Sequence, residues 1–333
     1  MLSFLFYLAF LLAFVVVAVY AERKIAAFIQ NRLGPMEVGP KGLLQTIADL
    51  LKMLQKEDIR ASAVDLVPFL VAPVIIFVSI FAGYSVLPLT STVSGAGLSS
   101  GLFLLLSIVS LDVFGILMAG WASQNKYSLF GAMRAVAQII SYEIPLGLSV
   151  LSVVMITGTL DLQETSVMQA GNGLVTWNMV QHPVLFVPFI VFFIAGLAES
   201  NRTPFDLPES ESELIGGYHT EYSGFRWGIF MLSEYGIMLL LSILGVVLFF
   251  GGWNSPLPNI GSIALYELTS GEGWDVFWLL SKSMLFIFVQ MWVRWTFPRL
   301  RVDQLMSLSW KYLTPASLVM LFICGIWKLW IIS

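Results

Sequence analysis

The chain of 333 residues is 58% hydrophobic and 11% charged, whereas about 25% of the residues in a soluble domain are charged. This composition excludes a soluble globular protein, and the formal net charge of −4 makes nucleic acid an unsuitable partner. One cysteine, Cys324, and two distant histidines, His182 and His219, form no cluster that would ligate an iron–sulfur centre, a haem or a metal ion. We therefore expect no redox centre and no metal site in this chain.

A helix needs about 20 apolar residues to cross the hydrocarbon core of a membrane, and eight segments meet or approach that length. The first lacks a basic start and a convincing cleavage site, so we interpret it as a helix of the mature protein and not as a signal peptide. No flexible linker and no internal repeat divides the chain, which predicts one polytopic, all-α integral membrane domain over residues 1–333. The eight predicted transmembrane helices cover residues 2–20, 66–87, 101–120, 134–157, 183–199, 228–251, 275–293 and 314–332.

The Lys and Arg residues are distributed unevenly among the seven predicted loops. The first, third, fifth and seventh loops carry seven, two, two and four of them, and the second, fourth and sixth loops carry none. By the positive-inside rule, the odd-numbered loops face the cytoplasm or its equivalent, and both termini lie on the opposite side.

The first loop contains a helical pattern of its own. Apolar residues recur at helical spacing from Leu43 to Leu54, and polar residues that include Asp49 and Lys52 follow on the other face. The pattern predicts an amphipathic helix over residues 43–56 in the first cytoplasmic loop. Two interpretations stay open: the helix lies in the headgroup plane of the membrane, or its polar face lines a cavity or a docking surface for a soluble partner.

The fifth loop concentrates acidic residues beside the membrane. Six of the 21 acids of the chain fall within 23 residues, where Arg202 is the only Lys or Arg. Crowded carboxylates next to a low-dielectric slab repel one another and lose hydration, which makes them candidates for proton handling. The apolar residues interleaved among them favour a folded element over a solvated surface, and Ser210 with Glu213 has the spacing of a capping box. The six acids are Glu199, Asp206, Glu209, Glu211, Glu213 and Glu221.

Glu143 lies inside the fourth predicted helix, two residues before Pro145. One ionised carboxylate at the centre of a bilayer costs about 2.5–3.5 kcal/mol on insertion scales, so packing alone is a poor explanation for it. Because Pro145 has no N–H to donate to the carbonyl of Ser141, we expect the helix to bend or open there. A carboxylate beside a freed carbonyl is a candidate station for water or protons.

The sequence places further charges within predicted membrane helices, among them Asp112, Glu234 and Lys282. Each acid is either a proton site or a structural acid that is protonated or paired with arginine. Lys282 either pairs with an acid or extends towards the membrane surface, and the sequence does not choose between the two.

Four segments of the predicted cytoplasmic face carry distinctive sequences. They are ERK at 22–24 with QNRLGP at 30–35, the stretch from GWAS at 120–123 to YE at 142–143, residues 198–222, and FPRLRVDQLM at 297–306. The run AESNRTPFDLPESESEL in the third segment is long and unusual for a loop. Together they resemble the H subunit of NADH:quinone oxidoreductase (respiratory complex I), the family of subunit 1 of the mitochondrial enzyme.

The resemblance implies a specific role. Subunits of this family sit at the joint between the peripheral redox arm and the membrane arm, and they form most of the entrance and lining of a quinone tunnel. FMN, the iron–sulfur clusters and the residues that hold the quinone headgroup belong to partner subunits, so this chain would bind no cofactor and would not be catalytic alone. The implied partners are the peripheral-arm quinone-site subunits, the antiporter-like membrane subunits, lipid quinone and phospholipids. The implied location is a bacterial cytoplasmic membrane or a mitochondrial inner membrane.

Carried over position by position, the resemblance assigns three groups of side chains. The candidates for the quinone tunnel are Arg23, Arg32 and Asp49. The candidates for proton coupling are Glu143, Glu199, Asp206, Glu209, Glu211, Glu213, Glu221 and Glu234, and the candidate counter-charges are Arg134, Arg202, Arg294 and Arg299. Two positions depart from the family, because Val302 stands where an aromatic residue is usual and Asp112 stands where the family is commonly uncharged.

The main hypothesis is that quinone reduction near the fifth loop changes the position or protonation of that loop, and that Glu143, Glu199 and Glu234 relay the change into the membrane. One alternative is a subunit of a membrane-bound hydrogenase or a ferredoxin-linked complex, which the full TPFDLPESESE loop disfavours. A second alternative is a stand-alone ion-coupled carrier. The absence of repeat symmetry in the sequence and the large one-sided loop surface disfavour the carrier.

Overall fold

The computed structural model describes residues 2–91, 98–207, 216–259 and 265–332, and every regular element in these ranges is helical. Seven helices in the described ranges are long and apolar enough to cross a membrane. They are α1 (Leu2–Ile29), α3 (Leu66–Tyr84), α4 (Gly101–Val109) continued by α5 (Asp112–Ala122), α6 (Lys126–Thr157), α11 (Gly224–Phe249), α13 (Glu272–Thr296), and α14 (Val302–Ser307) continued through a π-helical turn (Leu308–Leu313) into α15 (Thr314–Ile332).

The fifth predicted span differs from the others in length. Residues Pro183–Glu199 form a shorter apolar helix, in which a 3-10 turn (Pro183–Leu185) leads into α9 (Phe186–Glu199). The described structure therefore gives seven full-length spans and one shorter helix, and a count of eight transmembrane helices stays a prediction. The short helices α7 (Leu162–Met168), α8 (Asn178–Gln181) and α12 (Leu265–Leu268) were not anticipated from the sequence.

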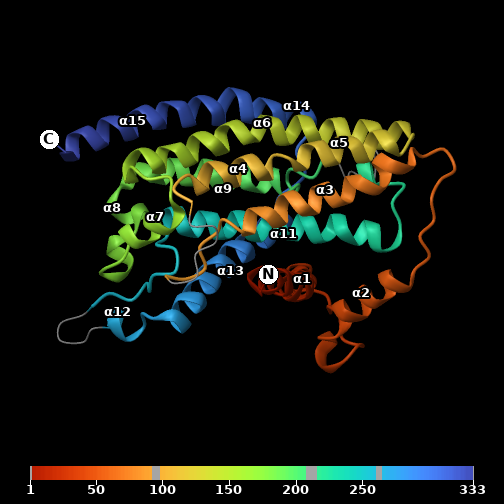
Figure 1. The fold of residues 1–333 in the computed structure, drawn as a ribbon, viewed down its shortest axis with the longest axis horizontal. Coiled ribbons are helices and arrows are strands. Elements are labelled where there is room, and N and C mark those ends of the chain that lie inside the picture. The colour runs from red at the N-terminus through yellow and green to blue at the C-terminus, as the bar shows by residue number, and fades with distance from the viewer. Residues whose placement is uncertain (1, 92–97, 208–215, 260–264, 333) are drawn as a thin grey trace.

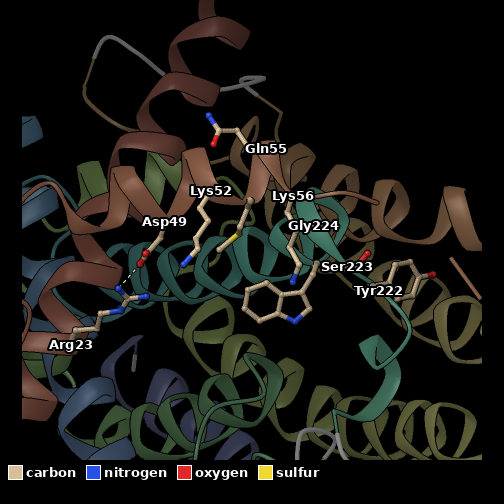
Figure 2. Close-up of a pocket in the computed structure, with 10 residues that line it drawn as sticks. Arg23, Asp49, Lys52, Gln55, Lys56, Tyr222, Ser223 and Gly224 are labelled. Atoms are coloured by element: carbon tan, nitrogen blue, oxygen red, sulfur yellow. Dashed lines mark hydrogen bonds and ion pairs between the residues drawn. The ribbon is translucent and has the colours of Figure 1, made fainter. Parts of the chain in front are cut away.

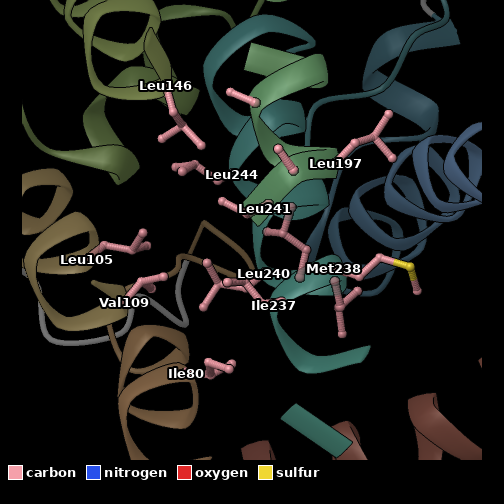
Figure 3. Close-up of a cluster of buried hydrophobic side chains, with 14 of the residues drawn as sticks. Ile80, Leu105, Val109, Leu146, Leu197, Ile237, Met238, Leu240, Leu241 and Leu244 are labelled. Atoms are coloured by element: carbon pink, nitrogen blue, oxygen red, sulfur yellow. The ribbon is translucent and has the colours of Figure 1, made fainter. Parts of the chain in front are cut away.

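Helix α11 is the centre of the packing, with α3, α9 and α13 against it (Figure 1). Every residue from Tyr235 to Phe249 is buried, because the sequence there is apolar all round and leaves no face for solvent. Figure 3 shows how Leu240 and Leu241 of α11 meet side chains of α3, α4 and α9, and Tyr84 of α3 donates a hydrogen bond to the carbonyl of Gly236. On the far side of α9, α6 packs against α5, α9 and α15.

Helix α1 runs steeply across this bundle and is seen nearly end-on in Figure 1. It contacts α11 and α13, and it also contacts α2 (Gln45–Gln55), which occupies most of the region where the sequence predicted a helix over 43–56. Several apolar side chains of α2 are exposed, among them Ile47, Leu51 and Leu54. Whether this face rests on lipid stays a prediction.

The segment that follows α2 is hydrogen-bonded to the residues at the start of α11. The hydroxyl of Ser223 accepts from the backbone N–H of Ile59 at 3.0 Å and donates to its carbonyl at 3.1 Å, and Arg226 pairs with Asp58 at 2.9 Å. Gly224 has φ +57°, and a Cβ there would lie 3.3 Å from the carbonyl oxygen of Lys56. The left-handed backbone and the close approach both require glycine, so this residue fixes the distance between α2 and α11.

Candidate functional site

A cleft of about 910 Å³ opens between α2 and the first turn of α11 (Figure 2). Its wall is polar on the α2 side, where Asp49, Lys52 and Lys56 lie one helical turn apart, and aromatic on the α11 side, where Trp227 lies. Arg23 of α1 closes one end and pairs with Asp49 at 2.5 Å. Asp49 also accepts from the side-chain amide of Gln45 at 3.0 Å, which fixes the carboxylate on α2.

Two smaller cavities adjoin this cleft. One, of about 150 Å³, is lined mainly by apolar residues of α1, α2 and α11, and the other, of about 330 Å³, contains several charged residues of α1, α11 and α13. Arg23 and Met53 line all three spaces. The three cavities are therefore neighbours around these two side chains, and together they lead from an open polar cleft to an apolar space and to a charged space.

The sequence-based tunnel candidates all lie on these walls. Arg23 lines all three cavities, Asp49 lines the cleft and the apolar cavity, and Arg32 lines the charged cavity. The structure thus brings the three side chains to one region of the molecule, and their role towards a ligand stays a prediction.

A buried ionic centre forms one wall of the charged cavity. Glu22 of α1 accepts from Arg202 at 2.8 Å and from the hydroxyl of Tyr235 at 2.6 Å, and its other carboxylate oxygen accepts from Arg294 of α13. The guanidinium of Arg202 also lies over the ring of Tyr235, 4.3 Å from its centroid. Four segments that are distant in the sequence therefore meet on one carboxylate, which we call the Glu22 centre (Glu22, Arg202, Tyr235 and Arg294).

The electrostatics of the Glu22 centre follow from its burial. Glu22 is 5% exposed and Arg202 is 4% exposed. Burial alone would disfavour the guanidinium charge, but the carboxylate of Glu22 outweighs it and raises the pKa of Arg202 above its ordinary value. Arg202 therefore keeps its positive charge at every physiological pH. Sequence reasoning missed Glu22 and Tyr235 as site residues, although an acid at the end of an otherwise apolar segment was a usable signal.

The acids predicted for proton coupling separate into groups. Glu234 lines the charged cavity, and the hydroxyl of Tyr218 lies 3.5 Å from its carboxylate, so it belongs near the Glu22 centre. Asp206 pairs with Arg299 at 3.0 Å, and Glu221 accepts from Asn125 at 2.7 Å.

The remaining predicted residues of these groups are placed as follows. Arg134 is half-buried on α6. Glu209, Glu211 and Glu213, with the short helix expected around Ser210, lie outside the described residues.

Three carboxyl groups form a second cluster further along the bundle. Asp112 of α5, Glu143 of α6 and Glu199 at the end of α9 lie close enough for their charges to interact. Glu143 and Glu199 line a cavity of about 410 Å³ whose other lining residues are apolar. Asp112 and Glu199 are buried, and one carboxylate oxygen of each has no hydrogen-bond partner among the described residues. We call these three side chains the carboxylate cluster.

The end of α9 joins the carboxylate cluster to the Glu22 centre. Glu199 and Arg202 are three residues apart, and the backbone N–H of Arg202 donates to the carbonyl of Leu197 at 3.2 Å. Gln138 of α6 holds the same turn by donating to the carbonyl of Ala198 at 2.8 Å. A displacement of Arg202 would therefore move the turn at the end of α9 and change the position of the carboxyl group of Glu199.

Lys282 follows neither of the two expectations. Its ammonium group donates to the carbonyls of Phe250 and Asn254, both at 2.9 Å, and lies 4.6 Å from the ring centroid of Trp177. The carbonyl of Phe250 lies at the end of α11, where a cation is favoured by the helix dipole, and the carbonyl of Asn254 lies in the segment that follows the helix. Lys282 is thus a cap for α11.

Comparison with known proteins identifies the family of the chain. Residues 2–325 match the family model described as NADH dehydrogenase. The chain is 52% identical to an H subunit (the one numbered 2) of the NADH-quinone oxidoreductase of Cytophaga hutchinsonii, over 98% of each chain. It is 54% identical to the corresponding H subunit of Chlorobium luteolum over 94% of this chain and 84% of the relative, and 46% identical to that of Brevibacillus brevis over 93% and 88%. The chain belongs to the NADH dehydrogenase family, together with the H subunits of NADH-quinone oxidoreductase.

Proposed function

We propose that this chain is the membrane subunit of a proton-pumping NADH-quinone oxidoreductase that forms the access tunnel for quinone and couples quinone reduction to proton translocation. The observation that carries the proposal is the convergence of three cavities on Arg23 and Met53, with the Glu22 centre in the wall of one of them. Electron transfer belongs to FMN and iron–sulfur clusters in partner subunits, and this chain supplies binding, guidance and electrostatic coupling.

The chemistry of a lipid quinone matches the cavities. Its isoprenoid tail is apolar, and the cavity of about 150 Å³ is walled by side chains such as Leu12, Val16 and Phe225. Its headgroup carries two carbonyl oxygens that accept hydrogen bonds, and the open cleft offers donors from Arg23 and Lys52. A quinone would enter through the apolar wall and move towards the cleft, where a peripheral-arm partner would complete the reduction site.

The coupling step uses the charges of the chain. Reduction of quinone draws protons and creates negative charge in the cavities, and two charges about 10 Å apart interact by roughly 1.7 kcal/mol at an effective dielectric constant of about 20. That field acts on Arg202, which is joined through the end of α9 to Glu199. Glu199 and Glu143 then change protonation and pass the change to neighbouring membrane subunits.

The proposed orientation in the membrane and the proposed partner subunits follow from the family. The odd-numbered loops, which include the first loop and its α2, face the cytoplasm and the peripheral arm, and both termini lie on the other side of a bacterial cytoplasmic membrane. Antiporter-like subunits are the proposed partners within the membrane.

The tunnel is tested by filling it. Met53→Trp in the assembled complex adds bulk where the three cavities meet, and we expect at least a tenfold loss of quinone reductase activity while the reduction of an artificial, water-soluble acceptor by the peripheral arm is unchanged. Leu51→Trp is the matched control, because Leu51 lies on the same helix with an exposed side chain. Equal activities of the two variants would rule out the tunnel at this position.

The coupling role is tested separately. Glu143→Gln and Glu199→Gln in the assembled complex remove one carboxylate each and keep the side-chain shape. We expect fewer protons pumped per electron in both variants. If quinone reduction and pumping both survive in a correctly assembled complex, the carboxylate cluster does not couple them.

A further inference from the structure

Helix α6 runs without interruption from Lys126 to Thr157, although Pro145 lies in its middle. A proline in a helix removes one N–H donor, and here the acceptor that loses its partner is the carbonyl of Ser141. Ser141 is buried, so water does not reach this carbonyl freely. The sequence predicted that the helix would bend or open at this point and leave the carbonyl available.

The carbonyl of Ser141 has a donor from another helix. The hydroxyl of Ser309 donates to it at 2.6 Å, and the side chain of Ser309 is completely buried. The Ser309 hydroxyl thus stands in for the backbone N–H that Pro145 lacks. Glu143 lies between the two residues whose bond is missing, Ser141 and Pro145, and so the geometry of its turn depends on Ser309.

Ser309 belongs to the π-helical turn Leu308–Leu313 between α14 and α15. Two more hydrogen bonds join this region to the turn before Glu143: the indole N–H of Trp310 donates to the hydroxyl of Ser141 at 3.3 Å, and the hydroxyl of Tyr142 donates to the carbonyl of Leu305 at 2.9 Å. π-helical turns are uncommon and are frequently found at functional sites.

The other end of the same segment contacts the fifth loop. The backbone N–H of Leu300 donates to the carbonyl of Pro204 at 3.1 Å, and Arg299 pairs with Asp206 at 3.0 Å. Residues 299–310 therefore touch the loop that carries Arg202 at one end and the turn that carries Glu143 at the other. This contact path is independent of the one through the end of α9.

We propose that Ser309 is a positioning residue, whose hydroxyl replaces the missing N–H of Pro145 and holds the turn that carries Glu143 in register with the segment 299–310. The functional part of the inference rests on the proposed function, because it assigns Glu143 to proton coupling. The structural part, the pairing of Ser309 with the gap left by Pro145, stands on the contacts alone.

The test is a double-mutant cycle in the assembled complex. Ser309→Ala leaves the carbonyl of Ser141 without a donor, and we expect at least a twofold fall in protons pumped per electron and a lower thermal midpoint of the complex. Pro145→Ala supplies an N–H to the same carbonyl, so the variant that carries both substitutions should recover both quantities. Ser317→Ala is the matched control, because Ser317 is a buried serine of α15 whose hydroxyl donates within its own helix, to Thr314.

The outcomes separate the two parts. If Ser309→Ala behaves as Ser317→Ala does, or if Pro145→Ala fails to restore the thermal midpoint, the pairing is overturned. A second outcome is that the thermal midpoint falls in Ser309→Ala and recovers in the double variant, while the number of protons pumped per electron stays at the wild-type value. If Glu143→Gln loses pumping in the same assay, Ser309 is structural only and the positioning role is overturned. If Glu143→Gln itself pumps normally, the proposed coupling role of Glu143 falls, and the functional part of this inference falls with it.

Discussion

Replacement of Glu22 by Gln should destabilise the folded protein, because this carboxylate is buried among three donors. Glu22 accepts from Arg202, Arg294 and Tyr235. Gln keeps the size of the side chain but removes the negative charge, and it turns one acceptor oxygen into an N–H donor that faces other donors. Arg202, which is 4% exposed, loses the carboxylate that it pairs with and keeps only the weaker attraction of Glu234.

The magnitude follows from burial. Removal of one partner of a buried ion pair costs about 3–5 kcal/mol, because the remaining charge is uncompensated. The side chain of Arg294 is 29% exposed and recovers part of its hydration, so we expect the lower part of that range, about 3 kcal/mol. The matched control is Arg23→Gln on the same helix. Arg23 pairs with Asp49, and their side chains are 44% and 25% exposed, respectively. A pair exposed in this way contributes only about 0.2–1 kcal/mol.

The assay is the free energy of unfolding of the purified protein in mild detergent, with the yield of assembled complex as a second readout. We expect Glu22→Gln to lose several times more stability than Arg23→Gln, and Glu22→Gln combined with Arg202→Gln to recover part of the loss, because the buried cation is then gone. Equal losses for Glu22→Gln and Arg23→Gln would refute the reasoning that burial gives the Glu22 centre its stabilising effect.

Three further outcomes are expected. Gly228→Leu places a side chain whose Cβ lies 3.2 Å from the sulfur of Met53, and it should raise KM for a long-tailed quinone more than for a short-tailed one; an equal rise would argue against a tail in the apolar cavity. Asp112→Asn should raise the thermal midpoint, because this buried carboxylate faces Glu143 and Glu199 and no cation among the described residues; a lower midpoint would contradict this. Burial, and then the charge of Lys328, lower the pKa of His182 below its ordinary value of 6.5. The unfolded chain therefore binds the proton more readily, and stability should be complete above about pH 6.5 and fall below it, whereas His182→Gln should flatten that fall in thermal scans at stepped pH.

The helical fold was readable from the sequence because long apolar runs can only be satisfied as helices in a membrane. The short span Pro183–Glu199 and the joint between α4 and α5 were harder, since apolar length sets the number of helices only approximately. The steep course of α1 has no signature in its own residues, because it is fixed by contacts with α11, α13 and α2.

The candidate site was predictable in its residue types and less so in its pairings. The sequence singled out Arg202 and Arg294 as counter-charges, but their common partner, Glu22, is 180 and 272 residues away along the chain. Likewise, the sequence predicted the gap at Pro145, while the donor that fills it, Ser309, is seen only when α6 packs against the π-helical turn that precedes α15. Long-range pairings of this kind depend on tertiary contacts, which periodicity and composition do not encode.

Labelling with a photoreactive quinone is the most direct measurement of where the substrate lies. An assembled complex is illuminated with a lipid quinone that carries the reactive group on its tail, and the labelled residues are identified by mass spectrometry. We expect the label on α1, α2 and the first turns of α11, around Met53 and Phe225, and its loss when unmodified quinone is added in excess. Competable label confined to the cavity beside Glu143, with none near Met53, would contradict a quinone path through the three joined cavities.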